Sequence, residues 1–367
     1  MKVLSVVGAR PQFVKLAPIA HEAARRGVDH TIVHTGQHYD PMLSDVFFQD
    51  LQIPAPAVHL GVGSGTHGRQ TGQMLAALDD VLESHVPDWV LVYGDTNSTL
   101  AAALAAVKQH VPVAHLEAGL RSFNRRMPEE HNRVLTDHAA DLLLAPTQGA
   151  MEHLAAEGLA ARSVLVGDVM TDVLLQVRDQ VAGTVSPLLA EESLEPGGYY
   201  LATIHRAETT DDPHRLAAVV ESLARLDAPT VLLAHPRLVA KARDAGISLE
   251  QGTLRPHAPL PYPELVAAVL EARGVVTDSG GLQKEAFLLR TPCTTVRTET
   301  EWVETVELGW NVLAEPGPDL VAAARRPRPA DTDAAPYGDG AAAARVLDAL
   351  ASGAVPRTDG VVSSRSS

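Results

Sequence analysis

Cysteine, lysine and aromatic residues are scarce in this chain of 367 residues. Its one cysteine, Cys293, excludes an internal disulfide bond and a cluster of thiolate metal ligands. The surrounding run is typical of the start of a strand, so we expect no catalytic thiol. No apolar run approaches the roughly 18 residues that a membrane-spanning helix needs, and residues 1–8 have the pattern of a buried strand rather than of a signal peptide. We therefore expect a cytoplasmic protein that does not bind a membrane.

Acidic residues outnumber basic ones, with 45 aspartate and glutamate residues and 30 lysine and arginine residues. The net charge of -15 argues against a general nucleic-acid-binding protein, which normally has a basic face. An anionic small molecule remains compatible with this charge, because local cations can reverse the potential at a pocket. Lysine is much rarer than arginine, and two of the lysines, Lys15 and Lys284, lie inside motifs.

Short apolar runs alternate with alanine-rich helical patterns from the first residue onward. Continuous apolar strands between helices indicate a parallel sheet that is covered on both faces. The pattern runs through the first half of the chain and then begins again, which predicts two doubly wound domains. The runs of the first series are residues 3–7, 31–34, 89–93, 113–116, 142–145 and 163–166, and those of the second are 200–204, 231–234, 274–277, 294–297 and 312–314.

We predict an α/β fold of two Rossmann-like domains that face a cleft, with a shared ligand at the carboxyl ends of the strands. The N-terminal domain covers residues 1–168 and contains the candidate catalytic carboxylates, and the C-terminal domain covers residues 169–340. Residues 341–350 form a short closing helix, and residues 351–367 form a disordered tail. Polar residues directly after the strands are therefore the candidates for the site.

The densest cluster of charged residues is the stretch 115–133, HLEAGLRSFNRRMPEEHNR. Glu117 directly follows an apolar run, and the pair Glu129 and Glu130 precedes a helical pattern. Asp95 ends another strand, and neighbouring parallel strands lie about 4.8 Å apart, so Asp95 and Glu117 can face one site. Two carboxylates held close cannot both ionise easily, which suits general acid-base catalysis. The alternatives are a solvated, salt-bridged helix start and, for Asp95, a helix cap.

Two motifs near the start of the chain contain glycine but predict different things. In GARPQFVK, residues 8–15, Arg10 and Lys15 lie at the start of the first helix, whose free N–H groups and dipole favour an anion. The alternative is that Pro11 simply starts the helix. Residues 63–68 match the pattern GxGxxG but do not follow the first long strand, which indicates a flexible loop rather than a dinucleotide site.

In the second half, polar residues again follow the strands. His205 and His235 come after the first and second strands, where a histidine can donate a hydrogen bond to a phosphate. In TDSGGLQKE, residues 277–285, Ser279 and the glycines open a helix whose backbone N–H groups can hold a diphosphate. Glu285 can accept hydrogen bonds from a ribose. The histidines are too scattered for a metal site, so we expect none.

Together the motifs GARPQFVK, YGDT, HLEAGLRS, PEEHNR, TIHRAE, TDSGGLQKE and TEWVE resemble those of the non-hydrolysing UDP-N-acetylglucosamine 2-epimerases, in one order over residues 1–315. The resemblance implies two Rossmann-like domains of the glycosyltransferase B type, a UDP-sugar substrate and a homodimer. It places Asp95, Glu117 and Glu129 as catalytic carboxylates and His205 as a catalytic residue near the leaving diphosphate. It assigns substrate binding to Arg10, Lys15, Arg133, His235, Leu265, Ser279, Gly280, Gly281 and Glu285, with the backbone of Leu265 at the uracil.

The resemblance also implies the reaction, an isomerisation of UDP-GlcNAc to UDP-ManNAc through elimination of UDP to 2-acetamidoglucal and re-addition. Neither a cofactor nor a metal is required. Trp302 and Val303 stand where many family members have an arginine and a proline. This departure and the sequence GLRSFNRRMPEEHNR look equally like the subgroup that epimerises UDP-2,3-diacetamido-2,3-dideoxyglucuronate. Further alternatives are a glycosyltransferase, which would need an acceptor groove, and a non-catalytic UDP-sugar sensor.

Overall fold

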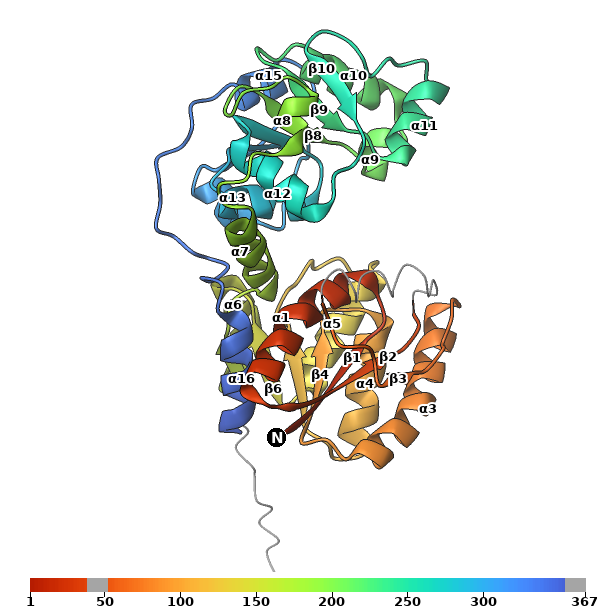
Figure 1. The fold of residues 1–367 in the computed structure, drawn as a ribbon. Coiled ribbons are helices and arrows are strands. Elements are labelled where there is room, and N and C mark those ends of the chain that lie inside the picture. The colour runs from red at the N-terminus through yellow and green to blue at the C-terminus, as the bar shows by residue number, and fades with distance from the viewer. Residues whose placement is uncertain (38–51, 354–367) are drawn as a thin grey trace, which may run out of the picture. The chain divides into compact units, whose positions relative to one another are not determined.

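The computed structural model describes residues 1–37 and 52–353 of the chain. By their contacts these residues form two compact units (Figure 1). Unit 1 comprises Met1–Val173 together with the chain from Ala335 onward, and unit 2 comprises Leu174–Ala334. Among the described residues, no helix is long and apolar enough to cross a membrane.

The described part of unit 1 contains one sheet of seven strands with helices on both faces. Its elements are β1 (Lys2–Val7), α1 (Arg10–Arg26), β2 (Asp29–His34), β3 (Val58–His59), α3 (His67–His85), β4 (Trp89–Tyr93), α4 (Asn97–Lys108), β5 (Val113–Leu116), α5 (Pro128–Ala139), β6 (Leu142–Ala145), α6 (Gln148–Ala156), the 3-10 helix η1 (Ala160–Arg162), β7 (Ser163–Leu165) and α16 (Ala342–Ser352). The strand order is β3-β2-β1-β4-β5-β6-β7, and every neighbouring pair is parallel.

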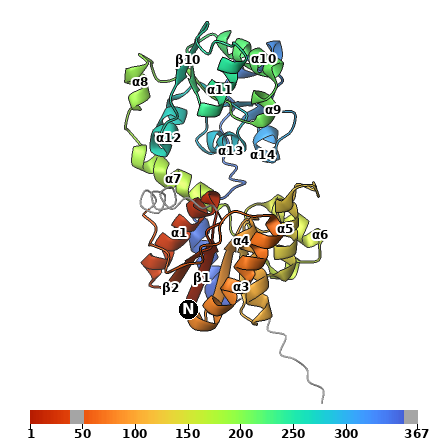
Figure 2. The same cartoon turned by 90° about the vertical axis from the view of Figure 1, so that its right-hand side faces the viewer.

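Alternate residues of the strands in unit 1 bury against two layers of helices (Figure 2). Val3 and Val7 of β1 pack with α1, whereas Leu4 and Val6 pack on the opposite face with α3 and α4. Successive side chains of a strand point to opposite faces of the sheet. The continuous apolar run of β1 therefore needs both helical layers for its burial.

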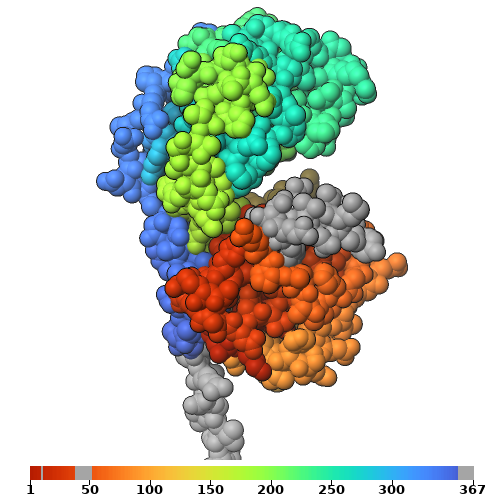
Figure 3. All heavy atoms as spheres, viewed as in Figure 1, coloured from red at the N-terminus to blue at the C-terminus, as the bar shows by residue number. Residues whose placement is uncertain are grey.

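The last described helix, α16, returns to unit 1 and packs against α1 (Figures 1 and 3). Val346, Leu347 and Leu350 belong to the same core cluster as the apolar residues of α1. Arg26 at the end of α1 pairs with Asp348 at the edge of this contact. The C-terminal segment therefore belongs to unit 1, because the apolar face of α16 is buried there.

These contacts differ from the domain boundaries that we predicted. We placed the change of domain after residue 168, whereas the division falls after Val173, inside α7 (Val169–Val181). We assigned residues up to 340 to the second domain, whereas those from Ala335 onward belong to unit 1. A segment rich in proline and alanine does not itself indicate which unit it packs against. The predicted disordered tail lies outside the described residues from residue 354 on.

Unit 2 is described throughout and contains a second sheet, of six strands. Its elements after α7 are α8 (Pro187–Glu191), β8 (Tyr200–Thr203), α9 (Ala207–Thr210), α10 (Pro213–Ala224), β9 (Thr230–Leu233), α11 (Pro236–Asp244), β10 (Leu254–His257), α12 (Tyr262–Glu271), β11 (Gly274–Thr277), α13 (Gly280–Leu288), β12 (Cys293–Thr295), α14 (Val303–Glu307), β13 (Asn311–Leu313) and α15 (Pro318–Ala324). The strand order is β10-β9-β8-β11-β12-β13, again with parallel neighbours.

Two strands at sheet edges, β3 and β10, were not among the predicted ones. β3 has only two residues, which is too short for a pattern. β10 contains Arg255 and Pro256 and therefore lacks an apolar run. Proline cannot donate a hydrogen bond to a neighbouring strand, and for this reason it is tolerated at a sheet edge.

The predicted pair of doubly wound parallel sheets is confirmed. In unit 1 the order of the strands reverses between β1 and β4, and in unit 2 it reverses between β8 and β11. In open parallel sheets, ligands bind outside the carboxyl ends of the strands at such a reversal. The residues that follow these strands are therefore the candidate functional residues of each unit, taken by itself.

Candidate active site

The turn after β1 is fixed by one buried glutamine. Gln12 accepts hydrogen bonds from the N–H groups of Gly8 and Ala9 at 2.8 and 3.0 Å. Its amide nitrogen donates to the carbonyl oxygen of Tyr93 at 2.8 Å, at the end of β4. A Cβ atom on Gly8 would lie 1.9 Å from Thr35 Oγ1, so a larger residue does not fit. The turn that opens α1 is thereby tied to the neighbouring strand of the reversal.

Lys15 of α1 forms an ion pair with Glu117, which follows β5. Burial lowers the pKa of the Lys15 ammonium, but the charge of Glu117 and the hydrogen bond to it outweigh burial and raise the pKa above its ordinary value. Lys15 is therefore a cation at neutral pH. The structure thus brings together a predicted anion-binding lysine and a predicted catalytic carboxylate.

Glu117 has a backbone conformation that side chains rarely adopt, with a φ of 72°. Its N–H and that of Ala118 donate to the carbonyl oxygen of Leu144 at 3.1 and 3.2 Å. A Cβ atom on Gly94 would lie 3.0 Å from Glu117 Oε2 and 3.3 Å from Lys15 Nζ. Such strained residues cluster at active sites, where the surrounding structure enforces them. The left-handed turn directs the carboxylate of Glu117 toward Lys15.

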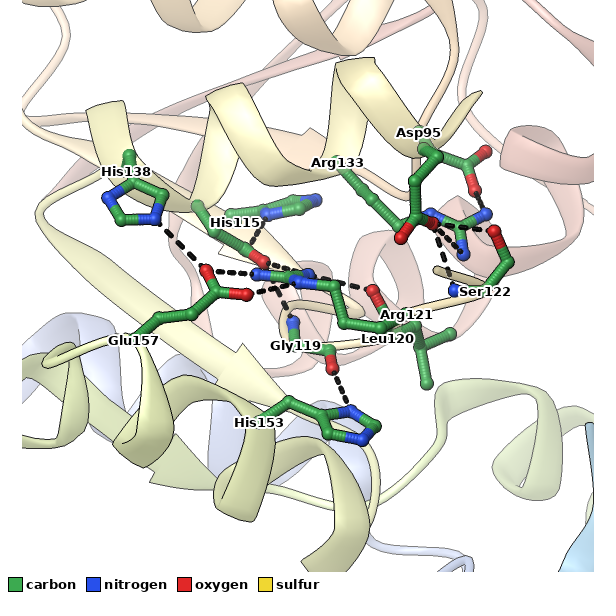
Figure 4. Close-up of polar contacts among 12 residues, drawn as sticks. Asp95, His115, Gly119, Leu120, Arg121, Ser122, Arg133, His138, His153 and Glu157 are labelled. Carbon is green, nitrogen blue, oxygen red and sulfur yellow. Dashed lines mark hydrogen bonds and ion pairs between the residues drawn. The ribbon is translucent and has the colours of Figure 1, made fainter. Parts of the chain in front are cut away.

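Asp95 follows β4 and pairs with Arg133 of α5 (Figure 4). The backbone carbonyl of Asp95 accepts a hydrogen bond from the side chain of Asn132 at 2.9 Å. The residue that caps α4 is Thr96, whose hydroxyl accepts a hydrogen bond from the N–H of Thr99 at 3.3 Å. The alternative that Asp95 is the helix cap is therefore wrong, and its carboxylate faces an arginine instead.

Glu129 and Glu130 both lie in the first turn of α5, but their surroundings differ. Glu130 is buried, and its carboxylate accepts hydrogen bonds from the N–H and hydroxyl of Ser122 and the N–H of Phe123 at 2.8 to 2.9 Å. Burial raises the pKa of Glu130, but these hydrogen bonds and Arg133 outweigh burial and lower the pKa. Glu129 is half-buried and has no hydrogen-bond or ion-pair partner among the described residues. The catalytic role of Glu129 stays a prediction.

In unit 2, His205 follows β8 and is anchored by Asp278, which follows β11. The carboxylate of Asp278 accepts hydrogen bonds from the backbone N–H groups of His205 and Arg206, both at 3.0 Å. It also lies 3.4 Å from His205 Nδ1. The Asp278 side chain is fully buried, whereas that of His205 is 46% exposed. Asp278 therefore holds a histidine ring that a ligand can reach.

The N-terminus of α13 has the features of an anion site. Ser279 caps the helix, and its hydroxyl accepts a hydrogen bond from the N–H of Leu282 at 3.5 Å. Gly280 and Gly281 are the first two residues of the helix. A Cβ atom on Gly280 would lie 2.3 Å from Glu301 Oε1, whereas one on Gly281 would meet nothing within 4 Å. Gly281 thus leaves open space beside the first N–H groups of α13.

Glu285 lies further along α13 and accepts a hydrogen bond from the hydroxyl of Tyr262 at 3.0 Å. Burial raises the pKa of Glu285, and the Tyr262 hydrogen bond and the charge of Lys284 offset this only in part. Lys284 Nζ lies 4.4 Å from the centre of the Trp302 ring, which is a cation–π contact. The tryptophan that departs from the motif therefore covers a lysine of α13.

Three other predicted binding residues lie at or near helix starts. Arg10 is the first residue of α1. His235 caps α11, and its Nδ1 accepts a hydrogen bond from the N–H of Arg237 at 3.2 Å. The N–H of Leu265 donates to the carbonyl of Pro261 at 2.9 Å, so this donor is already used within the protein. The binding roles of these residues stay predictions.

We predicted that Cys293 is not a catalytic residue and that the protein has no metal site. Burial raises the pKa of the Cys293 thiol to about 12, which makes it unsuitable as a nucleophile. Within residues 1–37 and 52–353, no three His, Cys, Asp or Glu side chains are grouped as metal ligands would be. That the reaction needs no metal stays a prediction.

Three buried residues that shape the site were missed at the level of sequence. Gln12 is the third residue of its helix, a position from which a glutamine often bonds back to the preceding turn. Asp278 lies inside the motif TDSGGLQKE, but we did not predict a role for it. Asp137 has no local signal of its own. Its spacing of four from Arg133 and seven from Glu130 places these three residues on one face of α5, which would have indicated a charged, partnered face.

Comparisons with known proteins identify the family of the chain. A family model described as UDP-N-acetylglucosamine 2-epimerase matches residues 21–351. A Pseudomonas aeruginosa protein named UDP-2,3-diacetamido-2,3-dideoxy-D-glucuronate 2-epimerase is 45% identical over 361 residues, which cover 96% of this chain and 99% of that protein.

Solved structures agree in turn. The structure of UDP-GlcNAc 2-epimerase from Methanocaldococcus jannaschii has a TM-score of 0.83 at 36% identity and covers 96% of this chain and 100% of that chain. The same enzyme in complex with UDP-GlcNAc and UDP gives a TM-score of 0.78 at 37% identity, with the same coverage. The chain, with its two Rossmann-like units of the glycosyltransferase B type, therefore belongs to the UDP-N-acetylglucosamine 2-epimerase family of isomerases.

Proposed function

We propose that the protein is a non-hydrolysing UDP-GlcNAc 2-epimerase, which interconverts UDP-GlcNAc and UDP-ManNAc. The observation that supports this most directly is the pairing of two carboxylates with two cations at the carboxyl edge of the sheet in unit 1. Lys15 pairs with Glu117, and Arg133 pairs with Asp95. Carboxylates are common general bases, and the cations beside them suit an anionic substrate.

The proposed reaction proceeds by elimination and re-addition. A carboxylate accepts the proton from C2, the electrons of that C–H bond form a C1–C2 double bond, and UDP leaves with the electrons of the C1–O bond. UDP then adds back to C1 of the 2-acetamidoglucal while C2 receives a proton on the opposite face. Positioned acid-base groups contribute about 10²- to 10⁴-fold to such a step. Asp95, Glu117 and Glu129 are the proposed acid-base groups.

Unit 2 is the proposed binding unit for UDP. The free N–H groups at the start of α13 and the open space beside Gly281 suit a diphosphate. The exposed ring of His205 is the proposed partner of the leaving phosphate oxygen, and Glu285 that of the ribose. The M. jannaschii relative was solved in complex with UDP-GlcNAc and UDP, which supports the same ligand class here.

A second substrate is favoured by one specific observation. The P. aeruginosa relative, which shares 45% identity across nearly its whole length, is named for UDP-2,3-diacetamido-2,3-dideoxy-D-glucuronate. The chemistry at C2 is the same for both sugars, so the paired carboxylates suit either one.

We also propose a homodimer in the cytoplasm. The single, buried cysteine suits a reducing compartment, and the dimer follows the resemblance to the family. Light scattering during size-exclusion chromatography tests the dimer, and a mass of one chain would contradict it.

The deciding experiment incubates the protein separately with UDP-GlcNAc and with the diacetamido uronate in D₂O and follows each by NMR. We expect deuterium at C2 of both epimers of the true substrate. An unlabelled, unchanged sugar nucleotide excludes that sugar as the substrate. Release of UDP with transfer of the sugar to an acceptor, without label at C2, would indicate a glycosyltransferase instead.

A further inference from the structure

Three buried ionisable side chains, Asp137, His115 and Arg121, form a cluster near the turns that follow β4 and β5, and Figure 4 labels His115 and Arg121. Asp137 of α5 and His115 of β5 are fully buried, and the Arg121 side chain is 2% exposed. The Asp137 carboxylate lies 2.6 Å from His115 Nδ1 and 2.7 Å from Arg121 Nη1. None of the three was singled out as a catalytic or binding residue.

The cluster is bonded to both of these turns. His115 Nε2 donates to the carbonyl oxygen of Gly94 at 2.7 Å, and Gly94 directly precedes Asp95. The other oxygen of Asp137 accepts the N–H of Gly119 at 3.1 Å, and Gly119 comes two residues after Glu117. One buried carboxylate therefore connects, through one imidazole, the two loops on which the catalytic carboxylates stand.

The bonds require hydrogens on both nitrogens of His115. The carbonyl oxygen of Gly94 can only accept, so Nε2 donates to it. Burial raises the pKa of Asp137, but His115 and Arg121 outweigh burial and lower the pKa, so this carboxylate is ionised and also accepts. His115 accordingly donates a hydrogen bond from each ring nitrogen, from Nδ1 to Asp137 and from Nε2 to Gly94.

Stability alone gives a weak reason for this arrangement. Buried ion pairs lose hydration that their mutual attraction repays only in part, and apolar replacements are often neutral or stabilising. The need to place the two loops accurately gives a stronger reason for the cluster, because an error of about 1 Å in the position of a catalytic group reduces a rate by roughly 10²-fold.

We propose that Asp137 and His115 are positioning residues, which fix the separation of the Asp95 and Glu117 carboxylates without touching the substrate. This rests on the proposed function, in which those carboxylates transfer the proton at C2. Arg121 completes the charge balance of Asp137.

Glu157 provides a matched control within the same network. It binds the other side of Arg121, with its oxygens 2.7 and 2.9 Å from Nε and Nη2. Its other hydrogen-bond partner in the described chain is His138, at 3.0 Å. Glu157 shares the arginine of Asp137 but has no bond to either turn.

The first experiment compares Asp137→Asn with Glu157→Gln. For Asp137→Asn we expect kcat to fall by about 10²-fold, with KM and the affinity for UDP close to those of the wild type. Glu157→Gln should retain kcat within about twofold. Equal losses in the two variants, or a loss in KM rather than kcat, would overturn the positioning role. If Asp137→Asn does not fold, His115→Gln makes the same test while Asp137 keeps Arg121.

The second experiment needs no variant. Nitrogen-15 NMR of the histidine rings of the wild-type protein should show His115 with hydrogens on both nitrogens at pH 7. A neutral ring would lack one of the two bonds and would overturn the bridge. Because this measurement does not depend on turnover, it separates the two proposals. Absence of C2 exchange in the wild type would count against the epimerase, whereas a neutral His115 would count against the bridge.

Discussion

The two sheets share one strand order over six strands, but the residues at their carboxyl edges differ in chemistry. At the edge of unit 1, Asp95 pairs with Arg133 and Glu117 pairs with Lys15. At the edge of unit 2, the carboxylate of Asp278 is satisfied mainly by backbone N–H groups. The rest of that edge consists of a serine cap and two glycines at the start of α13.

The difference shows how one fold serves two purposes. Carboxylates can transfer a proton, and backbone N–H groups at a helix start suit the binding of a phosphate. The two sheets have similar carboxyl edges, and the residues that follow each strand determine the chemical function of that edge. The comparison predicts that substitutions of the carboxylates in unit 1 reduce turnover and that substitutions at the start of α13 in unit 2 reduce binding.

The largest expected effect tests the edge of unit 1. Glu117→Gln keeps the shape of the side chain but removes the proton acceptor, and we expect kcat to fall by about 10²- to 10⁴-fold. Asp95→Asn should behave likewise. Calorimetry should show nearly unchanged affinity for UDP in both variants. Full turnover in either variant would exclude the proposed role of that residue, and an equal loss of UDP affinity would break the comparison between the units.

The next effect tests the edge of unit 2 through Gly281→Ala. A methyl group in a filled site costs about 1–3 kcal/mol, which is roughly a 5- to 150-fold increase in the Kd for UDP. The free protein should be stabilised, because alanine replaces a helical glycine with open space around it. Calorimetry and thermal melting measure the two effects.

Gly72→Ala in α3 is the control for this substitution. Gly72 is also a helical glycine with nothing within 4 Å of an added Cβ atom. It should give the same stabilisation with unchanged UDP affinity. If Gly281→Ala also leaves the affinity for UDP unchanged, the diphosphate does not bind at the start of α13.

A third prediction separates the charges of unit 1 that stabilise the fold from those that act in the reaction. Glu130→Gln should lower the free energy of unfolding by about 1–3 kcal/mol, because buried donors lose a charged acceptor. The pKa of Glu130 is lowered in the folded state, so its stabilisation is present above the ordinary value of 4.5 and is lost as the pH falls below it. Urea unfolding at pH 7 and at pH 4 should therefore show a smaller difference from the wild type at pH 4.

The neighbouring substitution Glu129→Gln is the control. It should leave the free energy of unfolding within about 0.5 kcal/mol of the wild type, yet reduce turnover. The opposite result, with Glu129 needed for stability and Glu130 for turnover, would exchange the two assignments.

The smallest expected effect concerns Glu285 in unit 2. Burial raises its pKa in the folded state, so the protonated form is favoured and the wild type loses stability as the pH rises through the folded pKa. Glu285→Gln cannot titrate. Its melting temperature relative to that of the wild type should therefore be higher at pH 8 than at pH 5. A difference that does not change with pH would mean that burial does not affect the ionisation of Glu285.

The strands and several motif roles were predictable because they depend on local sequence. β4, with five buried residues in a row, was predicted with its observed bounds, whereas β10 was missed because Pro256 interrupts it. The position of Ser279 after a strand predicted the observed start of α13. The resemblance to the family singled out Glu129, but the burial of Glu130 was not predictable from local sequence, because it depends on which face of α5 meets the loop at Ser122.

The sequence by itself determined the two parallel sheets, the placing of charged and glycine-rich motifs after their strands, and the family. These follow from hydrophobic patterning and motif order, which are properties of neighbouring residues. Only the tertiary structure decided that Lys15 pairs with Glu117, that Asp137 joins two turns through His115, and that the last helix packs on unit 1. These contacts join residues up to hundreds of positions apart, and the packing of buried faces brings them together.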